Sequence, residues 1–160
     1  MVMNTSNFPK AAETTKPPKH QANVKRTRIL VVEDNPLSST LLDQLLKVHG
    51  YEILRTAEGW EAIDLTRDQQ PDLILMDIGL PDICGLEVIR LLKQDNQTKT
   101  IPIIVVTAFA MPGDEKRGSE SGCDAYITKP ITIDKLLRTI ESLLSCSPLI
   151  TREISGWISP

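Results

Sequence analysis

Acidic residues follow two apolar runs of the sequence, at positions where a buried strand would end. Glu33 and Asp34 come directly after RILVV, and Asp77 comes directly after LILM in the stretch LILMDIGLP. Three carboxylates in one cleft repel one another unless a cation or a proton lies between them. Mg²⁺ takes carboxylate and carbonyl oxygens and commonly joins them to phosphate. The pattern therefore predicts a Mg²⁺ site at these three acids, with the backbone carbonyl of Gly79 as a further ligand.

If two of these acids bind a metal ion, the third is available for a reaction. The third carboxylate, which we take to be Asp77, can then attack phosphorus and form an aspartyl phosphate. Thr107 ends the apolar run IIVV and Lys129 follows DAYIT, so a hydroxyl and an ammonium are available to hold phosphoryl oxygens. Each residue alone has an ordinary explanation, such as a helix N-terminus for the acids or solvent for the lysine. The prediction rests on the group as a whole.

These residues need strands and helices that bring them to one place. From Arg28 onward, apolar runs of strand length alternate with segments of helical period. The predicted strands are residues 28–32, 51–57, 72–76, 101–106 and 124–128. The first predicted helix begins after the N-cap Asn35 and ends at Gly50. The second lies around residues 60–65 and ends before Pro71. The other three cover residues 85–94, 113–121 and 132–144.

Apolar residues keep helical spacing in two of these helices. The apolar positions with helical spacing in the first are Leu37, Leu41, Leu45 and Val48. Those expected to face inward in the last are Ile133, Leu136, Leu137, Ile140, Leu143 and Leu144.

Five consecutive strand-helix units predict an α/β fold, a doubly wound parallel sheet with helices on both faces. The flavodoxin-like strand order 2-1-3-4-5 is favoured for five strands, and it places the first and third strands side by side where the winding reverses. Ligands bind in that crevice, beyond the carboxyl ends of the strands. Four strand ends then deliver polar groups to one crevice, and the second strand, ending at Ala57, delivers none.

The remainder of the chain suggests two flanking segments around one domain. Residues 1–26 are rich in Pro, Lys, Thr and Asn and predict a disordered arm, residues 27–145 the domain, and residues 146–160 a C-terminal tail. The tail contains apolar residues, and either packing against its own domain or docking to a partner would account for them. Too few residues follow the last helix to form a DNA-binding or catalytic domain, which predicts a single-domain protein.

Composition limits the classes of binding partner and the cellular compartment that we expect. The formal net charge of −3 and the pI near 5.4 argue against a nucleic-acid-binding surface. The N-terminus has no apolar signal region and no run is long enough to span a membrane. Cys84, Cys123 and Cys146 lack metal-ligand spacing and are expected to be reduced thiols. A soluble cytoplasmic protein that binds proteins or small ligands is the expectation.

The runs VVEDN, LILMDIGLP, VVTAFAMPGDE and DAYITKPI resemble the receiver domain of two-component response regulators over about residues 27–145. The likeness is greatest to single-domain regulators of the DivK type, and it implies a CheY-like fold. The resemblance implies that Asp77 is the phosphoacceptor, and that Glu33, Asp34 and the Gly79 carbonyl bind Mg²⁺ with it. It further implies that Thr107 and Lys129 sense the phosphoryl group, that Tyr126 is the switch aromatic, and that Lys129–Pro130 is a cis peptide.

The same resemblance implies partners in a phosphorelay. A histidine kinase or histidine phosphotransfer protein would donate the phosphoryl group, and its expected docking surface is Pro36, Ser38, Ser39, Leu42, Pro130 and Ile131. The expected output surface for a downstream protein is formed by residues 113–121, 124–128 and 132–144. Phe109, like Gly79, borders the path of the water that would hydrolyse the aspartyl phosphate.

An alternative of another class is a Mg²⁺-dependent phosphohydrolase that forms an aspartyl phosphate and turns over a small phosphate ester. Such an enzyme would want a second acid at position 79, where this chain has glycine. Steady release of phosphate from esters would favour the enzyme, whereas one phosphoryl group per chain would favour the receiver.

Overall fold

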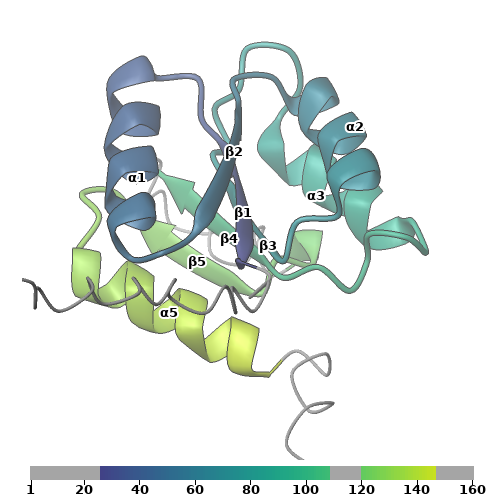
Figure 1. The fold of residues 1–160 in the computed structure, drawn as a ribbon. Coiled ribbons are helices and arrows are strands. Elements are labelled where there is room, and N and C mark those ends of the chain that lie inside the picture. Colours follow the sequence, from purple (N-terminus) through teal and green to yellow (C-terminus); the bar gives the residue numbers. More distant parts are fainter. Residues whose placement is uncertain (1–25, 109–119, 147–160) are drawn as a thin grey trace, which may run out of the picture.

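Five parallel strands form one sheet with the order β2-β1-β3-β4-β5, as predicted (Figure 1). The computed structural model describes residues 26–108 and 120–146. Its elements are β1 (Arg28–Val32), α1 (Pro36–Val48), β2 (Glu52–Thr56), α2 (Gly59–Gln69), β3 (Leu73–Met76), α3 (Gly85–Gln94), β4 (Ile103–Thr107), β5 (Ala125–Thr128) and α5 (Ile133–Ser145). Nearly all of the predicted arm 1–26, of the predicted tail 146–160 and of the helix predicted over 113–121 lies outside the described residues.

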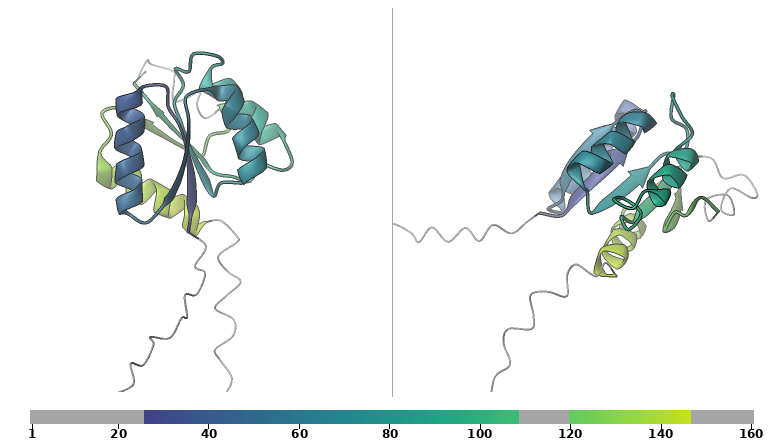
Figure 2. Two further views of the ribbon diagram at one scale, coloured as in Figure 1. Left: turned by 45° about the horizontal axis from the view of Figure 1, so that its top comes forward. Right: turned by 90° about the vertical axis from the view of Figure 1, so that its right-hand side faces the viewer.

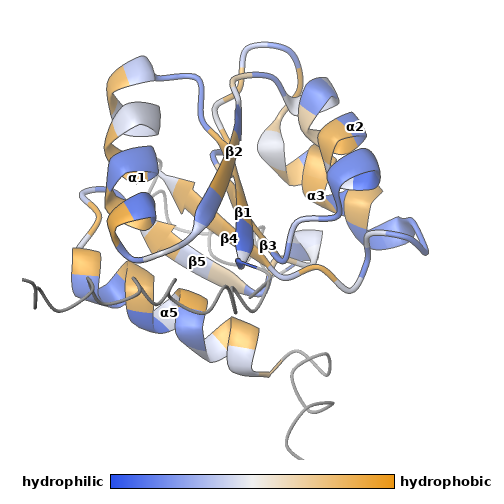
Figure 3. Cartoon of the chain, in the orientation of Figure 1, coloured by the Kyte–Doolittle hydropathy of each residue, from blue (hydrophilic) through white to orange (hydrophobic). Residues whose placement is uncertain are grey.

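The helices cover both faces of the sheet, α1 and α5 on one side and α2 and α3 on the other (Figure 2). Alternate residues of β1 serve the two sides, with Leu30 and Val32 packing toward α2 and α3, and Ile29 and Val31 toward α1 and α5. Every residue of β3 and β4 is buried, as expected for central parallel strands covered on both faces. In Figure 3, which is coloured by hydropathy, β4 is drawn largely in orange, the colour of hydrophobic residues. The two cores immobilise the strands whose ends carry the acids.

Local sequence accounts for the start of α1. The Asn35 side chain accepts hydrogen bonds from the backbone N–H groups of Leu37 and Ser38, and Pro36 occupies the first helical position. The helix ends at His49, and Gly50 follows with a φ of 88°, a conformation that glycine adopts without a steric penalty. The predicted beginning and end of this helix are confirmed.

Helical spacing alone does not identify the buried face of α1. Leu37, Leu41 and Val48 are 79%, 65% and 85% exposed, Leu45 is half-buried, and Leu42 and Leu46 are the buried leucines. The segment contains two adjacent leucine stripes, and both fit the helical period. Ile133, expected to face inward on α5, is likewise 49% exposed, although Leu136 and Ile140 are buried as predicted. Periodicity shows that an apolar face exists but cannot choose between neighbouring stripes.

Candidate functional site

Glu33 and Asp77 are brought together by the pairing of β1 with β3. Val32 is in register with Met76, so the next residue of each strand lies at the same edge of the sheet. The backbone N–H of Asp77 donates to the Val32 carbonyl at 2.9 Å, which extends the ladder by one step. This is the point where the winding of the sheet reverses, and the predicted convergence of the two strand ends is confirmed.

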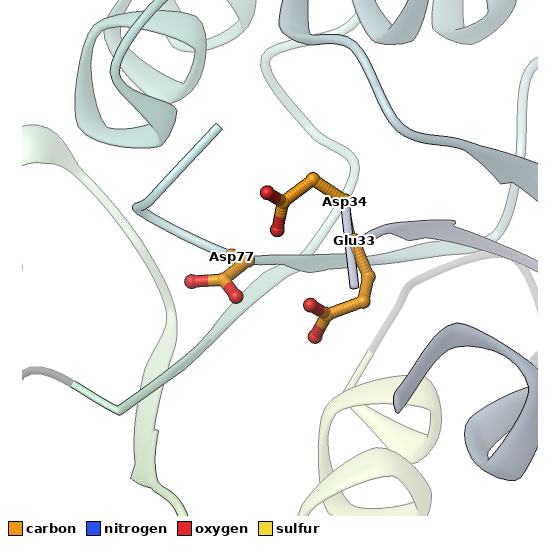
Figure 4. Close-up of side chains that lie close together, drawn as sticks. All are labelled: Glu33, Asp34 and Asp77. Carbon is orange, nitrogen blue, oxygen red and sulfur yellow. The ribbon is translucent and has the colours of Figure 1, made fainter. Parts of the chain in front are cut away.

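Three carboxylates meet at this edge (Figure 4). One oxygen each of Glu33, Asp34 and Asp77 lie within 4.8 Å of one another. Glu33 and Asp77 are buried and Asp34 is exposed, so the cluster opens toward solvent on one side. An oxygen-only donor set of this size and charge suits Mg²⁺, and the residues present fit such an ion.

Lys129 binds two of the three acids. Its Nζ lies 2.6 Å from Oε2 of Glu33 and 2.9 Å from Oδ2 of Asp77. The backbone N–H of Lys129 donates to the Thr107 carbonyl at 2.8 Å, which attaches the lysine to the end of β4. The ammonium therefore partly offsets the charge of the cluster from the β5 side.

The site perturbs the protonation of both partners in this ion pair. Burial raises the pKa of the Glu33 carboxyl, against the lowering effect of its hydrogen bonds from Lys129 and from the Asn35 N–H, and the neighbouring Asp77 charge raises it further. Burial alone would lower the pKa of the Lys129 ammonium, but its hydrogen bonds to Glu33 and Asp77 outweigh burial and raise it. The lysine stays charged, and the acids gain from any further cation.

The loop after β3 fixes the orientation of the Asp77 carboxylate. The Gly79 N–H donates to Oδ1 of Asp77 at 3.2 Å, on the oxygen that Lys129 does not contact. At the start of α3, a Cβ on Gly85 would overlap the Asp77 carbonyl, so only glycine allows this close approach. The backbone around Asp77 is held tightly at both ends of the loop.

Thr107 and Tyr126 lie on the same face of adjacent strands. Thr107 is fully buried at the end of β4, and Tyr126 is half-buried on β5 opposite Val105. Val105 and Tyr126 both pack against the core beneath α2 and α3. Position 107 has the same orientation as position 105, because side chains alternate along a strand. Thr107 pairs with Thr128, so Tyr126 lies two residues before the end of β5, and the prediction that both residues end their strands holds only for Thr107.

Two contributions to the site were absent from the sequence-based prediction. The end of β2 holds Glu33 through its backbone, because the Thr56 carbonyl accepts a hydrogen bond from the Glu33 N–H at 3.1 Å. Asp82, in the loop after Asp77, accepts hydrogen bonds from Gly59 and Trp60 at the start of α2. Both contacts join residues more than 20 positions apart, as their numbers show, and neither residue stands out by its spacing.

A groove of about 290 Å³ lies beside the acidic cluster. It lies between α1 and the segment from β5 to α5, and Lys129 is part of its wall. The residues that line it are Ser38, Leu41, Leu42, Leu45, Lys129, Pro130, Ile131 and Ile133. The Lys129–Pro130 peptide is cis, as predicted. Ile133, which was expected to face inward, and the exposed Leu41 both line this groove.

The sheet order and the acidic edge define the class of receiver domains with a flavodoxin-like topology. Residues 29–141 match the family model described as response regulator receiver domain, and the chain belongs to that family. As a member it is a phosphoacceptor switch of two-component signalling, not an enzyme that turns over a separate substrate.

Among curated proteins, the chain is similar to response regulators named DivK. The polar-differentiation response regulator DivK of Brucella anthropi is 52% identical over 116 residues, which are 72% of this chain and 94% of that protein. DivK of Brucella ovis has the same identity and coverage.

Solved structures show the same fold. A CheY-like receiver domain protein from Methanospirillum hungatei is 30% identical with a TM-score of 0.70, over 75% of this chain and 94% of that chain. The receiver domain of the sensor histidine kinase PA1611 from Pseudomonas aeruginosa is 32% identical with a TM-score of 0.71, over 75% of this chain and 98% of that chain. That structure has a magnesium ion coordinated in its active site cleft. Within the described residues of the present chain, no helix is long and apolar enough to cross a membrane.

Proposed function

We propose that this protein is a cytoplasmic, single-domain response regulator that accepts a phosphoryl group on Asp77 from a phosphohistidine donor in a Mg²⁺-dependent reaction. The observation that carries the proposal is the meeting of Glu33, Asp34 and Asp77 within 4.8 Å, opposite Lys129. The extent of the DivK match, 94% of that relative, supports a regulator without a DNA-binding output domain.

The proposed transfer is a displacement at phosphorus. An Asp77 carboxylate oxygen attacks the phosphorus atom, a new O–P bond forms, and the bond from phosphorus to the donor imidazole nitrogen breaks, with its electron pair leaving on that nitrogen. Glu33, Asp34, Asp77 and the Gly79 carbonyl would hold Mg²⁺, which when bound neutralises charge on the phosphoryl oxygens. Lys129 and the Thr107 hydroxyl would hold the remaining phosphoryl oxygens.

A small phosphodonor tests the assignment. Acetyl phosphate with Mg²⁺ should add one phosphoryl group per chain, observed as a single mass increment, and EDTA should prevent it. Asp77→Asn removes the nucleophile with little change of shape and should retain its fold and lose the increment. An undiminished increment in this variant would exclude Asp77 as the acceptor. Sustained phosphate release from small esters would instead favour the phosphohydrolase.

The groove is the proposed docking site for the phosphodonor protein. Ser38, Leu42, Pro130 and Ile131 were predicted for this surface and line the groove. It is mostly apolar and Lys129, which contacts Asp77, is part of its wall, so a partner docked there lies near Asp77. An exposed apolar surface beside a reactive group is a feature of protein-binding sites. A donor histidine on a helical partner would fit this arrangement.

Thr107 and Tyr126 are the residues proposed to transmit phosphorylation of Asp77 to the surface that binds a downstream protein. When Asp77 carries a phosphoryl group, the Thr107 hydroxyl should move toward it and the Tyr126 ring should occupy the released space, which biases an existing equilibrium. Coupling of about 1–3 kcal/mol changes partner affinity roughly 5- to 150-fold. Tyr126→Ala and Thr107→Ala should accept phosphate but lose most of this difference, measured by titrating a partner onto both forms. An unchanged affinity ratio in both variants would exclude the switch.

A further inference from the structure

Asp82 supplies an N-terminal cap to a helix that is not its own. It lies in the segment 78–84 between β3 and α3, here called the acceptor loop, and its two carboxylate oxygens accept hydrogen bonds from Gly59 N–H at 2.8 Å and Trp60 N–H at 2.9 Å. Glu58, the N-cap residue of α2, makes no side-chain capping bond. The bonds from Trp60 and Gly59 lower the pKa of the Asp82 carboxyl, so it stays ionised.

Packing reinforces this contact between the acceptor loop and α2. A Cβ on Gly59 would overlap the Ile83 side chain and would lie 3.3 Å from Cδ1 of Leu80. Ile83 and Leu80 therefore pack directly over the first residue of α2, on either side of Asp82 in the sequence. The acceptor loop is fixed to α2 by both polar and apolar contacts.

Hydrogen bonds connect both α2 and the acceptor loop to the acidic cluster. On the α2 side, the Glu58 N–H donates to Oγ1 of Thr56 at 3.1 Å, and the Thr56 carbonyl accepts from the Glu33 N–H. On the loop side, the Gly79 N–H donates to Oδ1 of Asp77. Asp82 thus closes a ring of contacts that runs from Glu33 through β2 and α2 to the acceptor loop and Asp77.

We propose that Asp82 is a positioning residue for phosphorylation: by capping α2, it holds the acceptor loop where the Gly79 N–H orients the Asp77 carboxylate and where the Gly79 carbonyl would be available to Mg²⁺. The inference rests on the proposed function, because it assumes that this edge of the sheet binds Mg²⁺. Asp82 does not touch the reacting atoms and acts only through the backbone of the loop.

The test compares Asp82→Ala with Asp95→Ala. Asp95 is another acid whose carboxylate accepts a backbone N–H, from Gln97, and it lies at the C-terminal end of α3, away from Asp77. MgCl₂ is titrated onto each ¹⁵N-labelled protein, and its dissociation constant is read from the Gly79 amide shift. Groups that support metal ligands typically change metal affinity by 10- to 100-fold, so Asp82→Ala should weaken Mg²⁺ binding about tenfold. Asp95→Ala should bind Mg²⁺ as the wild type does.

Amide exchange and a conservative variant separate positioning from general destabilisation. Exchange of the Gly59 and Trp60 amides should accelerate in Asp82→Ala, and Asp82→Asn, which keeps one acceptor oxygen, should have an intermediate Mg²⁺ affinity. Faster exchange with unchanged Mg²⁺ affinity would overturn the proposal, as would equal weakening in Asp95→Ala. If the wild-type protein does not bind Mg²⁺, the metal site does not exist, and the proposed function is then wrong as well.

Discussion

The acidic residues at the two edges of the sheet have different surroundings. At the amino edge, where the strands begin, Asp72 accepts the Arg28 N–H at 2.7 Å, and Asp124 accepts the Ile103 N–H and pairs with Lys93, both at 2.8 Å. At the carboxyl edge, where they end, three acids meet one lysine among the described residues. Glu33 and Asp77 also accept backbone N–H groups, but they lie close to each other and to Asp34, so the carboxyl edge keeps a surplus of negative charge.

This difference separates charges that stabilise the fold from charges that do chemistry. Acids whose oxygens accept backbone N–H groups at the start of a strand add to stability, because hydrogen bonds to a charged acceptor are strong. Acids that face one another lower stability until a cation arrives, and the binding of that cation is therefore linked to the state of the protein. The contrast predicts opposite behaviour for variants at the two edges.

The largest expected difference concerns the phosphorylation rate. Asp34→Ala removes an exposed member of the acidic cluster without disturbing a core contact, and the loss of a metal ligand should slow labelling by acetyl phosphate on the order of 100-fold or more. The rate is measured by mass spectrometry over a series of MgCl₂ concentrations. Asp124→Ala, at the amino edge, is the control and should be labelled at close to the wild-type rate. Equal slowing in both variants would abolish the distinction between the edges.

The second expected difference concerns stability in the absence of metal. Asp124→Ala leaves the Ile103 N–H without its side-chain acceptor and Lys93 without its acid, and should lower the free energy of unfolding by about 1–3 kcal/mol. Asp77→Ala should lower it by less, because the lost attraction to Lys129 is offset by relief of repulsion from Glu33. Urea unfolding in EDTA measures both. A larger loss in Asp77→Ala than in Asp124→Ala would contradict this view of the carboxyl edge.

The smallest expected difference concerns acid. The hydrogen bond from the Gln97 N–H and the ion pair with Arg67 lower the pKa of Asp95, so the ionised form stabilises the fold at pH values above the unfolded pKa of about 3.9. That contribution is lost as the pH falls through the lower, folded-state pKa. The difference in melting temperature between wild type and Asp95→Ala should therefore be constant near neutral pH and shrink in strong acid. A difference that grows as the pH falls would show the opposite sign of linkage.

Sequence reasoning succeeded where topology alone determines position. Once the chain is recognised as five parallel strands in the order 2-1-3-4-5, Glu33 and Asp77 must meet, since they end adjacent strands. It failed where a choice depended on side-chain packing. The two leucine stripes of α1 are equivalent by period, and only the docked helix shows that Leu42 is buried and that Leu41 is exposed, although both line the groove. The cap that Asp82 gives to α2 depends on how two loops lie together, and no local pattern encodes it.

The ion pair between Lys129 and Glu33 joins residues 96 positions apart in the chain. Contacts of such long range form late in folding, because a long loop must be closed before they can contribute. An incomplete chain that has made β1 and β3 already carries Glu33, Asp34 and Asp77, yet it lacks the cation that moderates their repulsion. Only a chain folded through to β5 gathers the acceptor, its acids and its lysine, so competence to receive a phosphoryl group coincides with completion of the fold.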